Sequence, residues 1–239
     1  MNQSISIHQP NFIPWPGYFY KIHKSNIHVM YDDVQFSKGS YTNRVRILNA
    51  GRVQWLTVPI GDYFKKKINL VTVSKKDWTS EHLRKIESAY SKSDFFDDFF
   101  DDFEKLYSEA KSLEYLFEVN LVFFNYFIEL LNINTQIINS SLFNIQTSST
   151  LRIAQLIQEI DSEAVYLYGS GGSNYQDEEI FKNNRIKIQK IEYGNTIYNQ
   201  NNNQQEFVPG LSIIDGLFNI GSKGCIKIVS GKDSINEED

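Results

Sequence analysis

The sequence is poor in cysteine, with Cys225 as the only one among 239 residues. A single thiol cannot form an internal disulfide, and it excludes the cysteine-rich class of zinc sites. Long apolar runs are lacking too, since no stretch approaches the ~18 consecutive apolar residues of a membrane-spanning helix. The first residues show no basic region followed by an apolar core, the pattern of a secretory signal peptide. We therefore expect a cytoplasmic protein that folds without disulfides and does not insert into a membrane.

The chain also lacks a surplus of basic residues. It has 24 lysines and arginines against 29 acidic residues, which gives a net charge of −5. This balance argues against a nucleic-acid partner, because such partners are bound by clustered positive charge. With 41% hydrophobic residues the chain can bury a sizeable core. We expect one domain over residues 1–231 and a disordered acidic tail over residues 232–239.

Proline is scarce but concentrated, since three of the five prolines, Pro10, Pro14 and Pro16, fall within seven residues. They follow an alternating apolar run at residues 5–7 that predicts a strand. Proline fixes φ and keeps the residue before it extended, so a stiff polar loop must follow the strand. Pro16 suits the first turn of a helix. We interpret the loop as a functional one, whose candidate site residues are His8, Gln9, Asn11, Trp15 and Tyr18. The alternative is a rigid turn with a histidine that serves only the fold.

A second strand is predicted over residues 27–31, directly before Asp32 and Asp33. Strand, helix and strand within about 30 residues fit a βαβ unit. Ligands of open α/β sheets bind beyond the carboxyl ends of the strands, so we expect His8 and Asp32 to meet at one edge. The alternative for Asp32 is a solvated turn, where aspartate is common.

Residues 41–60 predict a β-hairpin with a turn at residues 49–51. Strand alternation places Arg44 and Arg46 on one face, where two guanidinium groups suit a carboxylate or phosphate. Pairing with Asp32 or Asp33 is an equally weighted alternative. Asn43, next to the pair, is a further candidate for the binding site.

Residues 79–140 are predicted to form a helical insertion. Phenylalanines at helical spacing oppose a face of aspartates at residues 97, 98, 101 and 102, which indicates core on one side and solvent on the other. We do not interpret those aspartates as a metal site. His82 shares a face with Ile86 and is typical of a core or rim histidine.

A glycine-rich loop lies between a predicted strand at residues 165–168 and a short helix near residues 176–182. Such a loop can direct backbone N–H groups and a helix N-terminus at an anion. It lacks the Lys-Ser/Thr of a Walker loop and the third glycine of a dinucleotide-binding loop. Its candidate residues are Gly169, Ser170, Gly171 and Tyr175.

Six segments in order along the chain carry a family resemblance. They are HQPNFIPWPGYF at 8–19, YDDVQF at 31–36, NRVRI at 43–47, WLTVP at 55–59, YGSGGSNY at 168–175 and FVPGLSIIDGLFNIG at 207–221. Together they resemble the WbqC-like family, which is found with genes for bacterial surface polysaccharides. The resemblance implies a sugar acceptor and makes His82 a candidate site residue. We expect a Rossmann-like α/β fold with a parallel or mixed sheet, a β-hairpin and the helical insertion.

The candidate set lacks a classical nucleophile, and His8 with Asp32 supplies too few ligands for a metal, so no metal is assigned. A base, an acidic partner and anion donors remain, which suits transfer of an activated group to an amine or hydroxyl. Our hypothesis is N-acyl or aminoacyl transfer to a nucleotide-linked amino sugar of O-antigen or capsule biosynthesis. His8 is its base, Asp32 orients the base or the amine, and Arg44 and Arg46 hold the anion.

Two alternatives stay open: an ATP-consuming nucleotidyltransferase or amide ligase of the same pathway, and a non-catalytic nucleotide-sugar binding protein. The donor is left open between an acyl thioester and a carboxylate activated by ATP. An acyl-carrier partner and a homo-oligomer are left open as well.

Overall fold

The computed structural model describes residues 2–74, 77–169, 171, 176–194, 196–200 and 206–231. The acidic tail predicted over residues 232–239 lies outside these ranges, as do the site candidates Ser170 and Tyr175.

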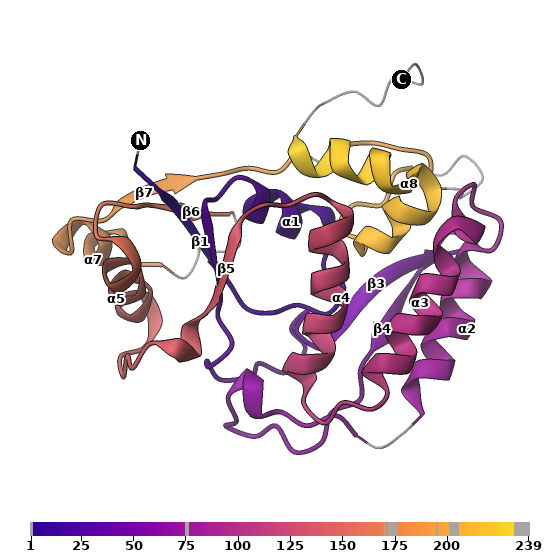
Figure 1. Ribbon diagram of the computed structural model, residues 1–239, viewed down its shortest axis with the longest axis horizontal. Coiled ribbons are helices and arrows are strands. Elements are labelled where there is room, and N and C mark those ends of the chain that lie inside the picture. The colour runs from indigo at the N-terminus through magenta and orange to yellow at the C-terminus, as the bar shows by residue number, and fades with distance from the viewer. Residues whose placement is uncertain are drawn as a thin grey trace.

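A five-stranded parallel sheet organises the molecule (Figure 1). Its strands are β1 (Ser4–His8), β2 (Ile27–Met30), β5 (Gln136–Asn139), β6 (Val165–Tyr168) and β7 (Lys187–Lys190). Their spatial order is β5-β2-β1-β6-β7, which is 3-2-1-4-5 when the five strands are numbered by appearance. That is the order of the classic nucleotide-binding α/β sheet. The predicted Rossmann-like fold class is confirmed.

The central strands β1 and β2 are buried on both faces, as in a sheet that helices cover on both sides. Ile5, Ile7 and Val29 join a core with α5 (Ser149–Asp161) and α7 (Glu178–Asn183). Figure 1 shows α5 and α7 on one side of the strands and α1 and α4 on the other. The helix α1 (Pro16–His23) begins at Pro16, as predicted from the preference of proline for the first turn of a helix.

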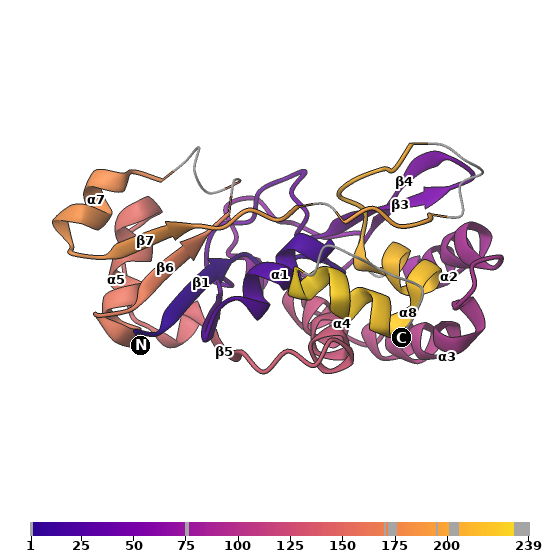
Figure 2. The same ribbon diagram turned by 90° about the horizontal axis from the view of Figure 1, so that it is seen from above.

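The hairpin forms a separate antiparallel sheet of β3 (Arg44–Asn49) and β4 (Arg52–Thr57). It packs in the larger hydrophobic core with the predicted helical insertion, which consists of α2 (Trp78–Tyr90), α3 (Phe96–Ala110) and α4 (Leu116–Leu130). Figure 2 shows the hairpin with α2 and α3 at one end of the molecule and α5, α7 and β7 at the other. Two 3₁₀ turns complete the described elements, at Ile68–Leu70 and Ser140–Leu142.

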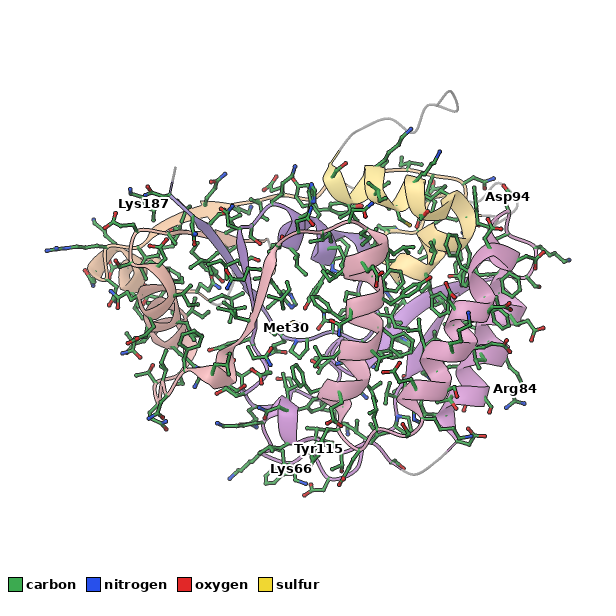
Figure 3. All side chains as sticks on the ribbon, in the orientation of Figure 1. Met30, Lys66, Arg84, Asp94, Tyr115 and Lys187 are labelled. Carbon is green, nitrogen blue, oxygen red and sulfur yellow. The ribbon has the colours of Figure 1, made fainter. Side chains whose placement is uncertain are left out.

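Between the two ends lies the carboxyl end of β2. Met30 there is fully buried in the larger core, and Figure 3 places it in the middle of the molecule, facing the helical insertion. Lys187 lies at the far end in the same view, and Arg84 and Asp94 at the opposite one. The sheet edge and the insertion therefore share one contact region.

Two elements differ from the sequence-based expectation. β5 was not predicted, because its four residues, QIIN, are too few to show a period of two. The last helix, α8 (Ile213–Ser230), contains Gly221, a residue type that commonly ends helices, but the helix kinks there at φ 66° and continues. The helix resumes because Cys225 and Ile228 extend its buried face beyond the glycine. None of the helices in the described ranges is long and apolar enough to cross a bilayer.

Candidate functional site

A cavity of about 620 Å³ lies at the carboxyl ends of β1 and β6. Ile7, His8 and Gln9 line it from the end of β1, and Tyr166 and Tyr168 from β6. From β1 the chain proceeds outward to β2 and β5, whereas β6 starts the other half of the sheet, so the cavity lies at the topological switch point. Ligands of open α/β sheets bind at this place, and the volume is typical of a small-molecule site.

The proline-rich loop that leaves β1 is buried, and distant residues bind its carbonyl groups. The amide of Asn120 on α4 donates to the backbone oxygens of Pro10 at 3.1 Å and Thr42 at 2.8 Å. The hydroxyl of Ser212, before α8, donates to the oxygen of Ile13 at 2.8 Å. Buried backbone polar groups need such partners, and these bonds fix the loop against the hairpin and the helical insertion. The predicted stiff loop is therefore present and is held from three sides.

His8 is half-buried at the cavity and held in one tautomer. Its Nδ1 lies 2.9 Å from the backbone oxygen of Gln9, which can only accept, so Nδ1 carries the hydrogen and Nε2 the lone pair. The ring of Tyr18 meets the imidazole edge-on at 4.9 Å, and its hydroxyl donates to the same oxygen of Gln9 at 3.3 Å. Burial, together with the nearby charge of Lys21, lowers the pKa of His8 to about 3. His8 is thus a neutral imidazole at any physiological pH.

Lys21 is a charged cavity residue that sequence reasoning missed. Its side chain is 8% exposed, and Nζ donates to the backbone oxygen of Ile7 at 3.0 Å. Burial lowers the pKa of Lys21 to about 7. A signal was present in the sequence: a helix that starts at Pro16 places Lys21 on the same buried face as Gly17 and Tyr18, four and three residues earlier.

The two arginines of the hairpin lie in different surroundings. Arg46 lines the cavity, and its Nη2 donates to the backbone oxygens of Pro209 at 3.3 Å and Gly210 at 3.1 Å. Arg44 does not line it; its guanidinium bonds the oxygen of Gly39 and lies 4.2 Å from the centre of the Trp55 ring. Neither arginine forms an ion pair with an acidic residue in the described ranges. Of the expected pair, only Arg46 is placed to meet a ligand in this cavity.

Asp32 does not meet His8, contrary to expectation. Its carboxylate accepts hydrogen bonds from the hydroxyl of Ser140 and the backbone N–H of Ser141, both at 3.0 Å, and from the amide of Asn69 at 3.1 Å. Asp32 is 1% exposed, so it ties the end of β2 to the segment after β5. The carbonyl of Gln9, rather than Asp32, orients the imidazole.

Asn43 and His82 form hydrogen bonds within the fold, away from the cavity. The amide of Asn43 donates to the backbone oxygen of Val58 at 3.0 Å, beside the hairpin. His82 is buried between the backbone oxygen of Thr57 at 3.1 Å and the hydroxyl of Tyr107 at 3.2 Å. Burial lowers the pKa of His82 to about 4. Neither residue lines the cavity.

Aromatic rings form much of the cavity wall. The rings of Tyr166 and Tyr168 stack at 6.1 Å, and the ring of Tyr193 contacts Trp15 and Tyr20, each at 5.4 Å. The predicted candidates that line the cavity are His8, Gln9, Asn11, Trp15, Tyr18, Arg46, Gly169 and Gly171. No cluster of three or more metal-ligating His, Cys, Asp or Glu residues occurs in the part of the chain that the structure describes.

The comparisons with known proteins bear on the whole chain. A model of the WbqC-like protein family matches residues 9–226. The chain belongs to the WbqC-like family. Among its relatives is the uncharacterized protein Rv1507c of Mycobacterium tuberculosis, which is 32% identical over 224 residues, 92% of this chain and 95% of the relative. The sequence-based family assignment is thereby confirmed.

Proposed function

We propose that this WbqC-like protein is a transferase that binds a nucleotide-linked amino sugar in the cavity and moves an acyl or aminoacyl group onto its amine. The observation that carries the proposal is the fixed tautomer of His8. With Nδ1–H bonded to Gln9, the lone pair of Nε2 is the only proton acceptor that the imidazole offers. An amine attacking the acyl carbon forms a C–N bond while the bond to the donor breaks, which releases the thiol of a thioester or the phosphate or AMP of an activated carboxylate. The amine must lose a proton in this step, and Nε2 can take it.

The low pKa of His8 fits such a role once a ligand is bound. Burial and the charge of Lys21 both disfavour the imidazolium. A phosphate group entering the cavity brings negative charge close to His8, which raises its pKa towards a useful range. On this account the base becomes effective only when the substrate is in place.

The aromatic wall supports the nucleotide part of the proposal. Tyrosine and tryptophan rings offer flat faces on which a base or a sugar ring can stack. The sugar acceptor and the surface-polysaccharide pathway rest on the family resemblance, and with them we place the reaction in the cytoplasm. The donor is an acyl thioester or an ATP-activated carboxylate.

A screen of nucleotide-linked amino sugars by mass spectrometry, with acyl thioesters or with carboxylic acids plus ATP, tests the proposal. For an accepted pair, His8→Asn should bind the sugar nucleotide normally and lose roughly 10²–10⁴-fold in rate. The matched control is His23→Asn, an exposed histidine of the same helix region, which should keep the wild-type rate. A loss of about tenfold or less in His8→Asn would remove the base role.

The same strand order also supports an ATP-consuming ligase or nucleotidyltransferase, since this sheet type binds mononucleotides. Release of AMP or diphosphate during the screen would favour that second candidate. Tight binding of a sugar nucleotide without turnover for any donor would instead favour a non-catalytic binding protein.

A further inference from the structure

The charge of the cavity lining is one-sided. Its described residues include two cations, Lys21 and Arg46, and no aspartate or glutamate. The contrast with Arg152 is instructive, because that buried arginine is 2.6 Å from the carboxylate of Asp33. Buried charges are normally paired in this way, since an unpaired one costs several kcal/mol. Two cations without acidic partners at one cavity therefore indicate that the cavity binds an anionic ligand.

The two cations have fixed positions. A helical side chain inclines towards the helix N-terminus, so Lys21 extends back along α1 to the end of β1, where it bonds Ile7. Arg46 is held by the carbonyls of Pro209 and Gly210, and its Nε is buried without a partner among the described residues. Backbone oxygens orient both groups without neutralising either.

We propose that Lys21 and Arg46 hold the diphosphate of a nucleotide-linked substrate, and that these protein cations replace the divalent cation that many nucleotide sites require. This rests on the proposed function and adds the charged part of the substrate to it. Oxygen ligands suited to Mg²⁺ would be carboxylates, which the described lining lacks. Arginine supplies a planar fork for phosphate oxygens, and lysine a compact point charge.

If Lys21 binds diphosphate in this way, binding should be coupled to the uptake of a proton. The titratable groups around Lys21 are His8 and His28 on the two strands, Tyr18 and Tyr20 on its own helix and, elsewhere in the cavity lining, Arg46, Tyr31, Tyr41, Tyr166, Tyr168 and Tyr193. None of them is an acid that keeps the amine charged at neutral pH. Burial lowers the pKa of Lys21 to about 7. Slightly above pH 7 its amine is therefore largely neutral when no anion lies beside it. An anion beside it restores the ammonium, so binding takes up a proton.

Isothermal titration with inorganic diphosphate tests the inference without any need for turnover. Wild-type protein should bind it in EDTA, and added Mg²⁺ should not tighten the binding. Lys21→Met and Arg46→Gln should each weaken it roughly 10- to 100-fold, the value of a charge-assisted hydrogen bond. The matched controls are Lys24→Met, whose amine bonds the oxygen of Ser230, and Arg44→Gln, which lies outside the lining. Both should bind as wild type does.

The number of protons taken up on binding can be measured by repeating the titration near pH ~8 in buffers of different ionisation enthalpy. Wild type should take up about one proton more than Lys21→Met, because protons of the diphosphate itself contribute equally to both proteins. Binding that requires Mg²⁺, or equal proton uptake by the two proteins, overturns the inference. If Lys21→Met does not fold, wild type and Arg46→Gln still decide it through the EDTA titration. His8→Asn should bind diphosphate normally, so an anion site without any transferase activity would refute only the proposed function.

Discussion

Two strand–loop–helix units meet at the cavity, and they are built in opposite ways. The first, β1 to α1, uses three prolines, and its loop is buried and bonded to α4 and α8. The second, β6 to α7, uses glycines, and a Cβ added at Gly169 or Gly171 would meet nothing within 4 Å. A close approach of other atoms therefore does not require glycine at position 169 or 171. The rigid, chemistry-bearing unit is the first one.

The comparison also explains what the helical insertion does for the site. Asn120 belongs to the insertion, yet its amide holds the loop that carries His8 and Gln9. The insertion is thus part of the frame of the cavity. The second unit receives no such support from the insertion in the described ranges; β6 pairs with β1 and β7, and α7 packs against α5.

The largest effect should come from breaking the support of the first loop. Asn120→Leu keeps the volume but leaves the buried oxygens of Pro10 and Thr42 without their donor, so we expect a loss of roughly 2–4 kcal/mol in the free energy of unfolding. Urea unfolding measures it. The matched control is Gln158→Leu, whose exposed amide donates to Asn184 at the end of α7; it should cost about 0.5 kcal/mol or less. Equal costs for the two variants would contradict the difference between the units.

Acid should destabilise the first unit and the insertion before the second unit. Burial lowers the pKa values of His8, His28 and His82, and no histidine lies in residues 165–190. A histidine whose pKa is lowered by folding contributes stability above its unfolded value of ~6.5, and this stability is lost as pH falls through the folded value. For His82, with a folded pKa of about 4, the loss reaches roughly 3 kcal/mol.

Tryptophan fluorescence follows this prediction, because all three tryptophans lie between residues 15 and 78. Urea midpoints read from it should fall between pH ~6.5 and ~4. His82→Gln, which cannot titrate, should flatten that slope. A slope that is unchanged in the variant would show that His82 is not held neutral by the fold.

Much of the fold could be predicted because it depends on local signals. Prolines mark the first loop and α1, and alternation marks β1, β2 and the hairpin. The strand β5 could not be found, since a half-buried four-residue edge strand is identified only by its pairing with β2. The kink at Gly221 was hidden for a related reason: whether a glycine ends or bends a helix depends on what packs beyond it.

The site was harder to predict than the fold. His8 was expected at the edge of the sheet and lines the cavity there, whereas Asp32 does not line it. Alternation, however, says only that Arg44 and Arg46 share a face, not that the segment at residues 209–210 reaches just one of them. The orientation of Asp32 depends on hydrogen bonds from Ser140 and Asn69, which are distant in the sequence and which no local pattern connects to it.

Glycine substitutions sharpen the comparison with a smaller effect. A Cβ at Gly17 would collide with the indole ring of Trp15, which lines the cavity. Alanine is otherwise favourable in a helix, so Gly17→Ala should change stability by about 1 kcal/mol or less while moving the indole. The indole is part of the aromatic wall, so we expect the binding of a nucleotide-linked sugar to weaken about tenfold, which corresponds to ~1.4 kcal/mol. Gly169→Ala, with open space around it, should bind within about twofold of wild type; the reverse order would mean that the glycine loop is the anion site.

The smallest effect is expected at Arg44, although its sequence pattern is the same as that of Arg46. Arg44→Lys loses the guanidinium contact with Trp55 and the bond to Gly39, a partly exposed arrangement worth about 1 kcal/mol or less. Since Arg44 does not line the cavity, diphosphate should bind to this variant as to wild type. Arg46→Lys should weaken binding with little change in melting temperature, because lysine cannot offer two parallel donors to a phosphate. If the two substitutions weaken binding equally, the ligand reaches beyond the cavity along the hairpin face, and the pair acts together as strand alternation predicts.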